Sequence, residues 1–330
     1  MGSALVVLVL VVVLALAFDY INGFHDTANA VATVVSTNVL PGRTAVLLAA
    51  ACNFFGAFAG VGVAKTIGGD IADPASVTQL VVAAALLGAI AWNLLTWYFG
   101  LPSSSSHALI GGLVGAAIAS SSTIFWSGIY DKVVIPMILS PFIGLVLGYF
   151  VMVAILWLFR RASPSRVSRG FRAAQSVSAA AMSLGHGMQD GAKTMGVIVL
   201  ALNVGGFQDD FDIPIWVFFM TAGVLAAGTY AGGWRIMRTL GRRIIALDPP
   251  HGFAAESTAS SILFVAAIGY GVPISTTHTI TSAIMGVGAT KRFRAVRWGV
   301  ASNIVGAWIF TLPGAALAAA VTYLVVNLFV

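Results

Sequence analysis

Charged residues are scarce in this sequence, at 8% of its 330 residues, whereas a soluble domain carries about 25%. Hydrophobic residues make up 59% of the chain and are gathered in long runs. So little charge excludes an ordinary soluble enzyme or binding domain. The composition predicts a multi-pass protein of the cell membrane, with lipid as its immediate surroundings.

Cysteine is almost absent as well. The single Cys52 lies in an apolar run, which excludes a disulfide framework and a thiolate metal site. The sequence also has no P-loop, nucleotide motif or zinc-ligand spacing, so we expect no cofactor and an ion gradient as the energy source. No basic residue precedes the first apolar stretch, Ala4 to Phe18, and we therefore expect no cleaved signal peptide.

Lysine and arginine are concentrated in three short segments: residues 160–172, 235–243 and 291–297. Each segment has four or five basic residues and no acidic one. Short loops rich in Lys and Arg stay in the cytoplasm, so all three segments are predicted to be cytoplasmic. The net charge of +6 is therefore a sign of membrane topology, and we expect no nucleic-acid partner.

Two hydroxyl-rich motifs interrupt the apolar runs: Gly-Leu-Pro-Ser-Ser-Ser-Ser-His at 100–107 and Gly-Val-Pro-Ile-Ser-Thr-Thr-His at 271–278. Proline followed by Ser or Thr is typical of a helix start, where the hydroxyl caps free backbone N–H groups. A helix start presents unpaired amides and partial positive charge, which attract anions. Two such starts, one in each half, predict a single anion site built from both halves.

The two motifs belong to a duplication of the chain. Asn22–Asn29 aligns with His186–Lys193 at an offset of 164, and Lys65–Gly68 aligns with Arg238–Gly241 at an offset of 173. The hydroxyl-rich motifs are 171 residues apart, and an acidic insertion at 206–212 absorbs the change in offset. Because order, type and spacing agree, we interpret the two halves as repeats.

The basic segments then determine the topology. Residues 235–243 and 291–297 flank the second hydroxyl-rich motif, so the apolar runs around it enter and leave on the cytoplasmic side as a re-entrant hairpin, about 253–290. The hairpin of the first half, about 80–119, lies between loops poor in Lys and Arg and is predicted to enter from outside. Each half then crosses three times, which makes the repeats inverted and places both termini outside.

The predicted fold is an all-α polytopic membrane protein with two inverted-topology repeats. Each repeat has three crossings, some of them broken, and one re-entrant helical hairpin. Repeat 1 covers residues 1–158, a basic cytoplasmic linker covers 159–172, and repeat 2 covers 173–330.

Two crossings of the first repeat carry more specific expectations. The segment from Ala4 to Leu40 is too long for one straight crossing, and polar residues interrupt it between Asp19 and Asn29. We therefore expect a broken helix there. The segment from Ala45 to Ala64 is rich in Gly and Ala, and we expect a plain crossing.

Two aspartates, Asp26 and Asp190, lie inside apolar segments at equivalent places. A charge at the bilayer centre costs about 2.5–3.5 kcal/mol or more and usually marks a transport pathway or coupling site. The alternative is a structural hydrogen bond between helices. Asn29 and Lys193 follow three residues later, on the same helical face. Asp26 with Asn29 offers oxygen ligands for a proton or a hard cation, whereas Lys193 could form an internal salt bridge with Asp190.

We assign the anion site to the hydroxyls and backbone amides of the two motifs: Ser104, Ser105, Ser106, Ser275, Thr276 and Thr277. The alternative is that these hydroxyls bond back to carbonyls of their own helices and have no further role. His107 and His278 follow the clusters and could cap, orient or titrate. The simplest interpretation of Glu256, near a basic loop, is a solvated carboxylate at a helix start.

Serine beside histidine in a membrane also raises the alternative of an intramembrane hydrolase. Such an enzyme needs one nucleophile and one base in distinct roles, yet here the whole motif is duplicated. An anion channel is a further alternative. Binding edges related by a twofold axis favour a transporter over both.

With these residues the sequence resembles the inorganic phosphate transporter (Pit) family, of the bacterial low-affinity permease type. Asn22-Gly-Phe-His-Asp-Thr-Ala-Asn-Ala-Val-Ala-Thr33 is similar to its first-repeat motif, and Gly185-His-Gly-Met-Gln-Asp-Gly-Ala-Lys193 to its second. The motifs at Pro102 and Pro273 resemble its hairpin tips, so the likeness covers nearly the whole chain. It implies import of inorganic phosphate, free or metal-complexed, by a proton- or cation-coupled symporter that is a homodimer in some members.

The chain departs from this family in two ways. Gln189, Asp190 and Lys193 stand where the second motif often has Asn-Asp and a later Asn, and the central hydrophilic loop is shortened to about Arg160–Arg172. The Lys193 ammonium would stand where a cation should sit, which argues against sodium in the second half. A lysine here resembles bacterial members thought to be proton-coupled, so we expect protons as the coupling ion, with sodium at Asp26 and Asn29 as the alternative.

Overall fold

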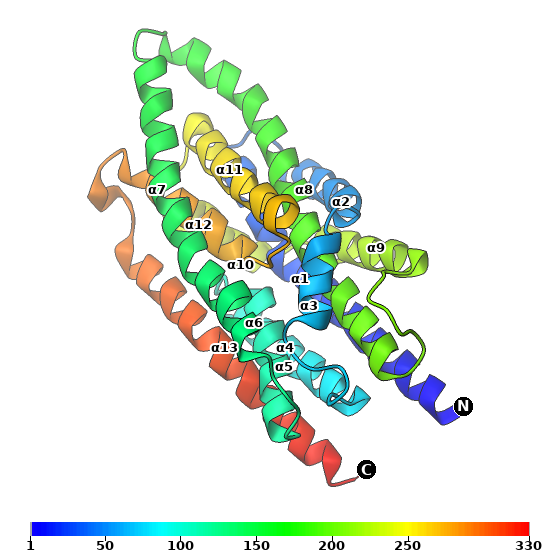
Figure 1. The fold of residues 1–330 in the computed structure, drawn as a ribbon. Coiled ribbons are helices and arrows are strands. Elements are labelled where there is room, and N and C mark those ends of the chain that lie inside the picture. Colours follow the sequence, from blue (N-terminus) through cyan, green and yellow to red (C-terminus); the bar gives the residue numbers. More distant parts are fainter. Residues whose placement is uncertain (1, 330) are drawn as a thin grey trace.

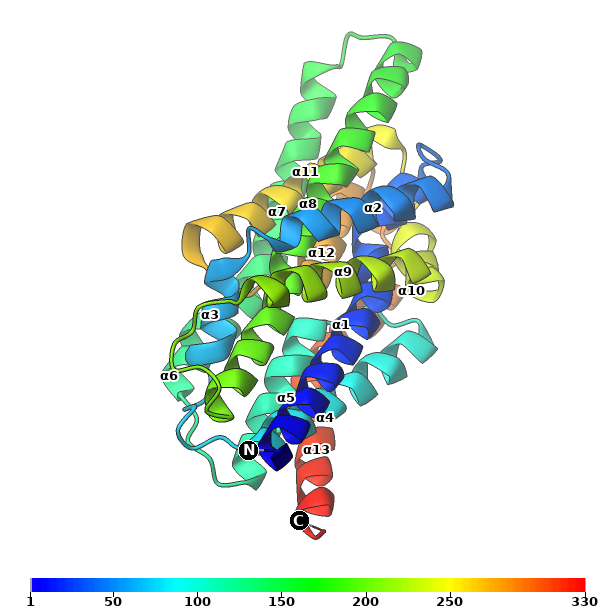
Figure 2. The ribbon, with the colours of Figure 1, turned by 90° about the vertical axis from the view of Figure 1, so that its right-hand side faces the viewer.

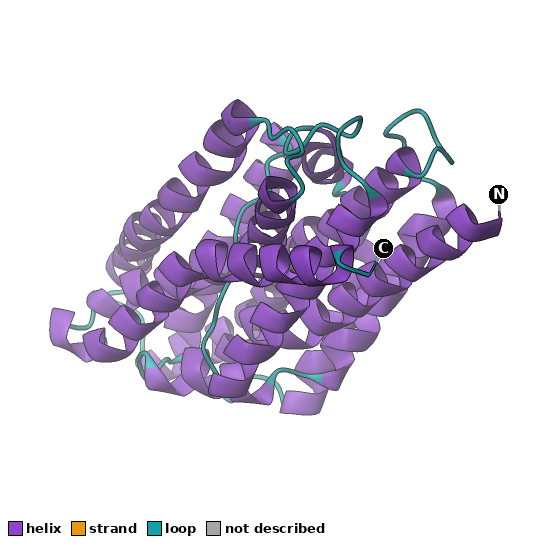
Figure 3. Ribbon diagram, turned by 90° about the horizontal axis from the view of Figure 1, so that it is seen from below, coloured by secondary structure: helices purple, strands orange, loops and turns teal. Residues whose placement is uncertain are grey.

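The computed structural model describes residues 2–329 and is built from helices, without a strand in that range (Figure 3). One isolated bridge, between Ala72 and Ile124, is the sole β-type pairing that these residues make. The helices of the first half are α1 (Gly2–Ser36), α2 (Gly42–Ala57), α3 (Val61–Gly69), α4 (Gln79–Phe99), α5 (Ser105–Ala119), α6 (Trp126–Ile129), η1 (Tyr130–Val134) and α7 (Ile135–Leu158). Those of the second half are α8 (Pro164–Val204), α9 (Ile215–Ala231), α10 (Trp234–Arg238), η2 (Thr239–Arg243), α11 (Pro249–Phe264), η3 (Val265–Tyr270), α12 (Thr276–Ala289), η4 (Phe293–Ala295) and α13 (Trp298–Asn327).

Five helical segments among the described residues are long and apolar enough to cross a membrane: α1, α4, α6 to α7, α11 to η3, and α13. Two bent pairs also pass this test when each is taken as one span. They are α2 with α3, bent by 68°, and α9 with α10 and η2, bent by 56°. In each half the bent pair follows the long first helix, α1 or α8, and precedes the hairpin, as the colours along the chain show (Figure 1). The chain is therefore an all-α polytopic protein, as its composition predicts.

The two halves run in opposite directions. In Figure 2, α1 rises from the lower end of the molecule and α8 descends from the upper end, and α7 and α13 also point in opposite directions. The N- and C-termini lie together at the lower end, opposite to the connection between α7 and α8. This arrangement is the one expected for inverted repeats with three crossings each.

The first predicted hairpin is formed by α4 and α5, and its two ends are tied together. Thr123 N donates to Ser76 Oγ and Ser122 Oγ donates to Ser76 O, both at 2.9 Å. Ser76 precedes α4 and the other two residues follow α5. The segment therefore leaves on the side from which it enters, at the same end of the molecule as the termini.

The second hairpin, formed by α11, η3 and α12, is closed in the same way at its ends. Asp248 caps the start of α11, and Lys291, just after α12, pairs with it at 2.9 Å. Partial burial raises the pKa of the Asp248 carboxyl, but hydrogen bonds from His251 and Lys291 outweigh burial and hold the pKa well below its usual range. Both hairpins are thus re-entrant. A left-handed glycine ends the first arm of each: Gly100 after α4, with φ of 65°, and Gly271 after η3, with φ of 62°.

The expectation of a broken first helix is wrong. The helix α1 is continuous for 35 residues and passes through the polar stretch without interruption. At 1.5 Å per residue it is about 52 Å long, so it extends beyond a core about 30 Å thick. Its polar side chains need no break in the helix because they find partners on other helices, as described below.

The expectation of a plain second crossing is also wrong. This segment is divided into α2 and α3, which are separated by Phe58 to Gly60. A Cβ at Gly60 would collide with the backbone oxygen of Met188, so the backbone passes directly against α8 at this point. The break places the two short helices on either side of the contact with α8.

The linker between the halves is shorter than the predicted range, residues 159–172. Because α8 begins at Pro164, residues 164–172 are the first turns of a 41-residue helix. Pro164 is well placed at the first helical position. The non-helical connection at the boundary of the repeats is therefore limited to residues 159–163.

The apolar core consists of two clusters with a polar layer between them. Along α1, Leu8 to Phe18 belong to one cluster and Ala28 to Val34 to the other. Along α8, Ala192 to Leu202 belong to the first cluster, and Ala179 and Met182 to the second. Between them lie the buried polar residues of both acidic motifs. The fold therefore concentrates its buried polar groups in the middle of the molecule.

Small residues permit α1 and α9 to pack closely. A Cβ at Gly228 would overlap the backbone oxygen of Tyr20, and one at Gly23 would lie 2.6 Å from Leu225 O. We expect Gly228→Ala to lower stability by about 1–3 kcal/mol, because the helices must separate to make room. Gly223→Ala, on the same helix, is the matched control, since its Cβ would have no atom within 4 Å. The thermal unfolding midpoint in detergent measures both, and equal midpoints for the two variants would contradict the packing account.

Candidate anion and coupling site

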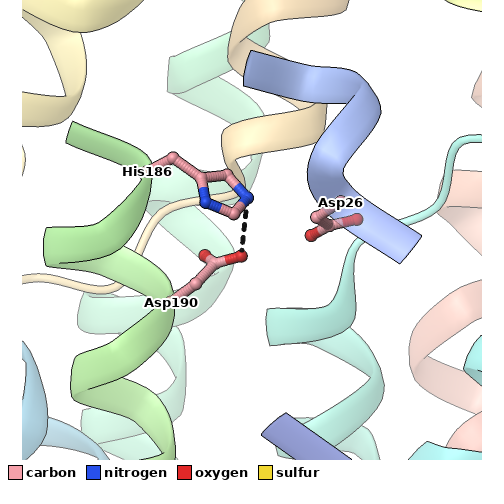
Figure 4. A group of neighbouring side chains, drawn as sticks. All are labelled: Asp26, His186 and Asp190. Carbon is pink, nitrogen blue, oxygen red and sulfur yellow. Dashed lines mark ion pairs between the residues drawn. The ribbon is translucent and has the colours of Figure 1, made fainter. Parts of the chain in front are cut away.

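The two acidic motifs face each other in the polar layer. Asp26 comes from α1, and His186 and Asp190 come from α8; all three are buried (Figure 4). One oxygen of each aspartate and one ring nitrogen of His186 lie within 4.8 Å of one another. Residues 160 positions apart thus form one compact group, as the duplication predicts.

Asp190 is held by groups of its own helix. Lys193 Nζ donates to Asp190 Oδ1 at 2.5 Å, and His186 Nε2 lies 3.1 Å from Asp190 Oδ2. All three side chains are fully buried. The predicted internal salt bridge between Asp190 and Lys193 is therefore present. A buried carboxylate with an ammonium partner can stay ionised at far lower cost than an unpaired one.

Asp26 has no ammonium partner among residues 2–329. His25 Nδ1 lies 2.6 Å from Asp26 Oδ1, and Ser105 Oγ donates to Asp26 Oδ2 at 2.9 Å. The carboxylate thus connects α1 directly to the start of α5. This contact links the first acidic motif to the first hydroxyl-rich motif.

The amide of Asn22 lies between the two carboxylates. With its nitrogen facing them, it is 3.3 Å from Asp26 Oδ2, 3.3 Å from Asp190 Oδ2 and 2.6 Å from Ser105 Oγ. A neutral donor in this position reduces the repulsion between two carboxylates that face each other. Asn22 therefore joins the halves at the centre.

The helix starts are built as the motifs predict. Ser104 Oγ accepts from His107 N, and Ser275 Oγ accepts from His278 N, at 3.3 and 3.1 Å. These two serines therefore serve as N-caps, and their O–H groups can still donate. The amides of the next residues, Ser105 and Thr276 among them, have no acceptor in their own helix. Both helix starts thus retain free donors in the polar layer.

The start of α12 is joined to α1 and to the other hairpin. Asn29 Nδ2 donates to Thr276 Oγ1 at 3.3 Å and to Thr277 Oγ1 at 2.8 Å. Thr277 Oγ1 donates in turn to Ser103 O at 3.0 Å. Ser106, which follows Ser105 in the first turn of α5, is buried. The six predicted anion ligands are therefore brought to the same layer as Asp26 and Asn29.

The two predicted histidines meet at the contact between the hairpins. The rings of His107 and His278 have centroids 4.8 Å apart, and His278 stacks on Trp308 of α13 at 4.0 Å. Trp308 Nε1 donates to Pro102 O at 3.0 Å. This stack holds the hairpin tips to each other and to α13, so its geometry favours an orienting role for the histidines.

Two further residues fix the hairpin tips from the acidic motifs. His25 Nε2 lies 3.1 Å from Thr96 Oγ1, in the first hairpin. Its counterpart in the repeat, Gln189, donates to Val272 O at 3.3 Å and accepts from Ile274 N at 3.1 Å, in the second hairpin. In each half, the residue before the central aspartate therefore holds the hairpin of that half.

The expectation of a solvated Glu256 is wrong. Its carboxylate is fully buried and accepts hydrogen bonds from Thr33 Oγ1, Gln175 Nε2 and Ser178 Oγ. These donors come from α1 and α8. Glu256 is therefore part of a second polar cluster, joined to the central site along α1 through Asn29 and Thr33.

The donor groups can be compared with the needs of a cation. The Asn29 Oδ1 atom is buried and has no hydrogen-bond partner in the described part of the chain, and an amide oxygen of this kind is a ligand type that a hard cation accepts. At the equivalent place in α8, the Lys193 ammonium already occupies Asp190. The donor sets of the two halves thus differ at this position.

Sequence reasoning did not single out Asn22, His186 and His25 as parts of the site, although all three lie in the quoted motifs. They are polar residues within apolar segments and one turn or less from an aspartate, which is the signal that could have identified them. Their partners became evident from the pairing of α1 with α8 and with the hairpins.

The model of the Phosphate transporter family matches residues 22–319. A protein of Rhizobium meliloti is 50% identical over 325 residues, or 97% of each chain, and one of Bacillus subtilis is 44% identical over 333 residues, or 99% of each. Both carry the name "probable low-affinity inorganic phosphate transporter". These names describe transporters and not enzymes, which sets the hydrolase alternative aside.

A solved structure described as a sodium-dependent phosphate transporter has the same fold. It aligns with a TM-score of 0.86 and covers 98% of this chain and 100% of the other, at 22% sequence identity. A likeness at that identity concerns the architecture of the helices. Together with the family match over both repeats, it confirms the resemblance that the motifs carry. The chain belongs to the phosphate transporter family.

Proposed function

We propose that this chain is a secondary active transporter of the cell membrane that imports inorganic phosphate by symport with protons. The basic segments 160–172, 235–243 and 291–297 face the cytoplasm in this proposal, and both termini are outside. The observation that supports it best is the meeting of two helix starts from opposite repeats beside Asp26. Ser105 donates directly to that carboxylate, and Thr276 and Thr277 accept from Asn29, one turn further along α1.

The donors at this place suit an anion that must be released again. Hydroxyls and free amides of α5 and α12 can replace the water around a phosphate. The side chains that contact Asp26, Asp190, Ser105 and Thr276 include no arginine in residues 2–329. Without a bidentate guanidinium, the anion is bound by neutral donors, which favours exchange over retention.

The carboxylates can select phosphate over sulfate. Phosphate near neutral pH carries an acidic proton and donates a hydrogen bond, whereas sulfate can only accept. A carboxylate beside the anion therefore meets a donor from phosphate and bare repulsion from sulfate. Like charges in a poorly screened site repel by several kcal/mol. Asp26 is the stronger candidate for this role, because Asp190 is already neutralised by Lys193.

The choice of coupling ion rests on the difference between the two aspartates, since Lys193 pairs with Asp190. An ammonium at Asp190 leaves no room for sodium there, so we assign coupling to protons at Asp26, with Asn29, Asp190 and Lys193 in supporting roles. Sodium bound by Asp26 and Asn29 is the alternative, and the free Asn29 oxygen favours it. An anion channel is the alternative from another class.

Uptake of labelled phosphate into proteoliposomes tests the proposal. With a proton gradient and a sodium gradient imposed separately, we expect accumulation above equilibrium on the proton gradient alone. Accumulation on sodium alone would support the sodium alternative. A channel would equilibrate phosphate without concentrating it, so failure to accumulate phosphate on any ion gradient contradicts symport.

The hydroxyls at the helix starts should contribute to phosphate affinity. Ser105→Ala and Thr276→Ala each remove one hydrogen bond, which we expect to weaken binding by about 0.5–1.5 kcal/mol, or roughly 2- to 10-fold in Kd. Ser261→Ala is the control, because Ser261 is exposed on α11 and its hydroxyl bonds to Ser257 O of the same helix. Unchanged phosphate affinity in both single variants and in the double variant removes these hydroxyls from the site.

Asp26→Asn should separate exchange from coupling. We expect this variant to lose accumulation on the proton gradient and to admit more sulfate, because the amide neither titrates nor repels. Asp190→Asn is measured beside it, and its effect on sulfate should be smaller since Lys193 offsets that charge. The assays are gradient-driven uptake, phosphate exchange and sulfate competition. If Asp26→Asn accumulates phosphate and excludes sulfate as the wild type does, the carboxylate has neither role.

A further inference from the structure

A third carboxylate lies beside the central pair. Asp19 is on α1, about two turns before Asp26, and is fully buried. Thr194 Oγ1 donates to Asp19 Oδ1 at 2.8 Å. Its other oxygen, Oδ2, is buried and has no hydrogen-bond partner among residues 2–329. Asp19 is therefore the least supported carboxylate of this region.

The three carboxylates differ in the groups that stabilise their negative charge. Asp190 has the Lys193 ammonium, and Asp26 has His25 and a serine hydroxyl. Asp19 has one neutral hydroxyl. A buried carboxylate with a free oxygen and no paired cation is strongly destabilised when ionised, and it usually takes up a proton. The geometry thus identifies Asp19 as a place where a proton can be stored.

Asp19 has no acidic counterpart in the second repeat, and it lies next to Lys193, which has no basic counterpart in the first. At the offset of 164, its counterpart is Ser183, whose hydroxyl bonds to Ala179 O of its own helix. Lys193 adds a positive charge to the second repeat, where its counterpart in the first repeat is the neutral Asn29. Because Thr194 follows Lys193 directly, the added negative charge and the added positive charge lie at the same contact between α1 and α8. Two opposite exceptions at one contact indicate that they work together.

Asp19 faces few other charges. Asp190 and Lys193 of α8 are the groups whose charges reach it. On the other helices packed against α1, Tyr98, Tyr230 and Arg43 are exposed. The remaining ionisable groups on these helices have other neighbours. Arg238 and Arg242 line a pocket with Ala32 and Ser36, Glu256 accepts from Thr33, and His278 stacks on Trp308. Arg235 stacks on Trp97 and Tyr98, His251 pairs with Asp248, Arg243 is exposed, and Cys52 is half-buried on α2.

We propose that Asp19 is a proton-binding carboxyl of the transport cycle, on the predicted extracellular side of the phosphate site, acting with Lys193. This inference rests on the proposed proton symport. A hydronium ion on the extracellular side transfers a proton to Asp19 Oδ2. One O–H bond of the hydronium breaks and one forms on the carboxylate, which leaves water and a neutral acid. While Asp19 is neutral, the ammonium serves Asp190 alone. When Asp19 releases the proton, its carboxylate competes with Asp190 for that ammonium.

Asp19→Asn tests this role, because asparagine keeps an oxygen for Thr194 but cannot titrate. In proteoliposomes with a gradient of one pH unit, we expect phosphate accumulation to fall about tenfold, since one coupled proton supplies a factor of ten per pH unit. Phosphate exchange without a gradient should persist, and its dependence on external pH should become flatter. Asp19→Glu should restore the pH dependence. Asp209→Asn, at an exposed aspartate outside the site, is the matched control.

The outcomes distinguish this inference from the proposed function. If the wild type accumulates phosphate on a proton gradient and Asp19→Asn does so equally, with the same pH profile, Asp19 binds no coupled proton. Equal loss of exchange and accumulation at every pH, with a lowered thermal unfolding midpoint, would show a structural role and overturn the proposal. Wild-type accumulation on sodium alone overturns it too. Failure of the wild type to accumulate phosphate on any gradient removes the proposed function itself.

Discussion

The rest of this structure depends on the burial of carboxylates in the middle of a membrane protein, where each must find its partners within the chain. Asp26 and Asp190 meet this condition by facing each other across Asn22 and by taking donors from α5 and α8. The two apolar clusters lie on either side of this layer. The helices α1 and α8 can therefore remain continuous, since their polar side chains find hydrogen-bond partners on neighbouring helices.

The two repeats hold their hairpins by equivalent contacts but differ in the charges beside their central aspartates. His25 and Gln189 hold the hairpins of their own halves in equivalent ways. Lys193, in contrast, neutralises Asp190 and leaves Asp26 as the carboxylate without an ammonium. The two halves thus share one arrangement of helices but differ in the charges at their contact.

The sequence allowed the hairpins and the meeting of the motifs to be predicted, because proline, hydroxyls and flanking charge are local signals. The continuity of α1 could not be predicted, since its polar stretch is stabilised by Ser105 and Thr194, which are distant in sequence. Glu256 was misjudged for the same reason, because Thr33 and Ser178 lie 223 and 78 positions away. Local patterns identify helix starts, whereas the partners of buried charges depend on how helices pack.

The central claim is that one phosphate is bound between the starts of α5 and α12, by both repeats together. A structure determined with bound phosphate, or with arsenate as a heavier analogue, tests it most directly. We predict density for a single anion within hydrogen-bond distance of Ser105 and Thr276 and adjacent to Asp26. Two separate anions, one at each helix start, or an anion bound away from both, would contradict a shared site built from inverted repeats.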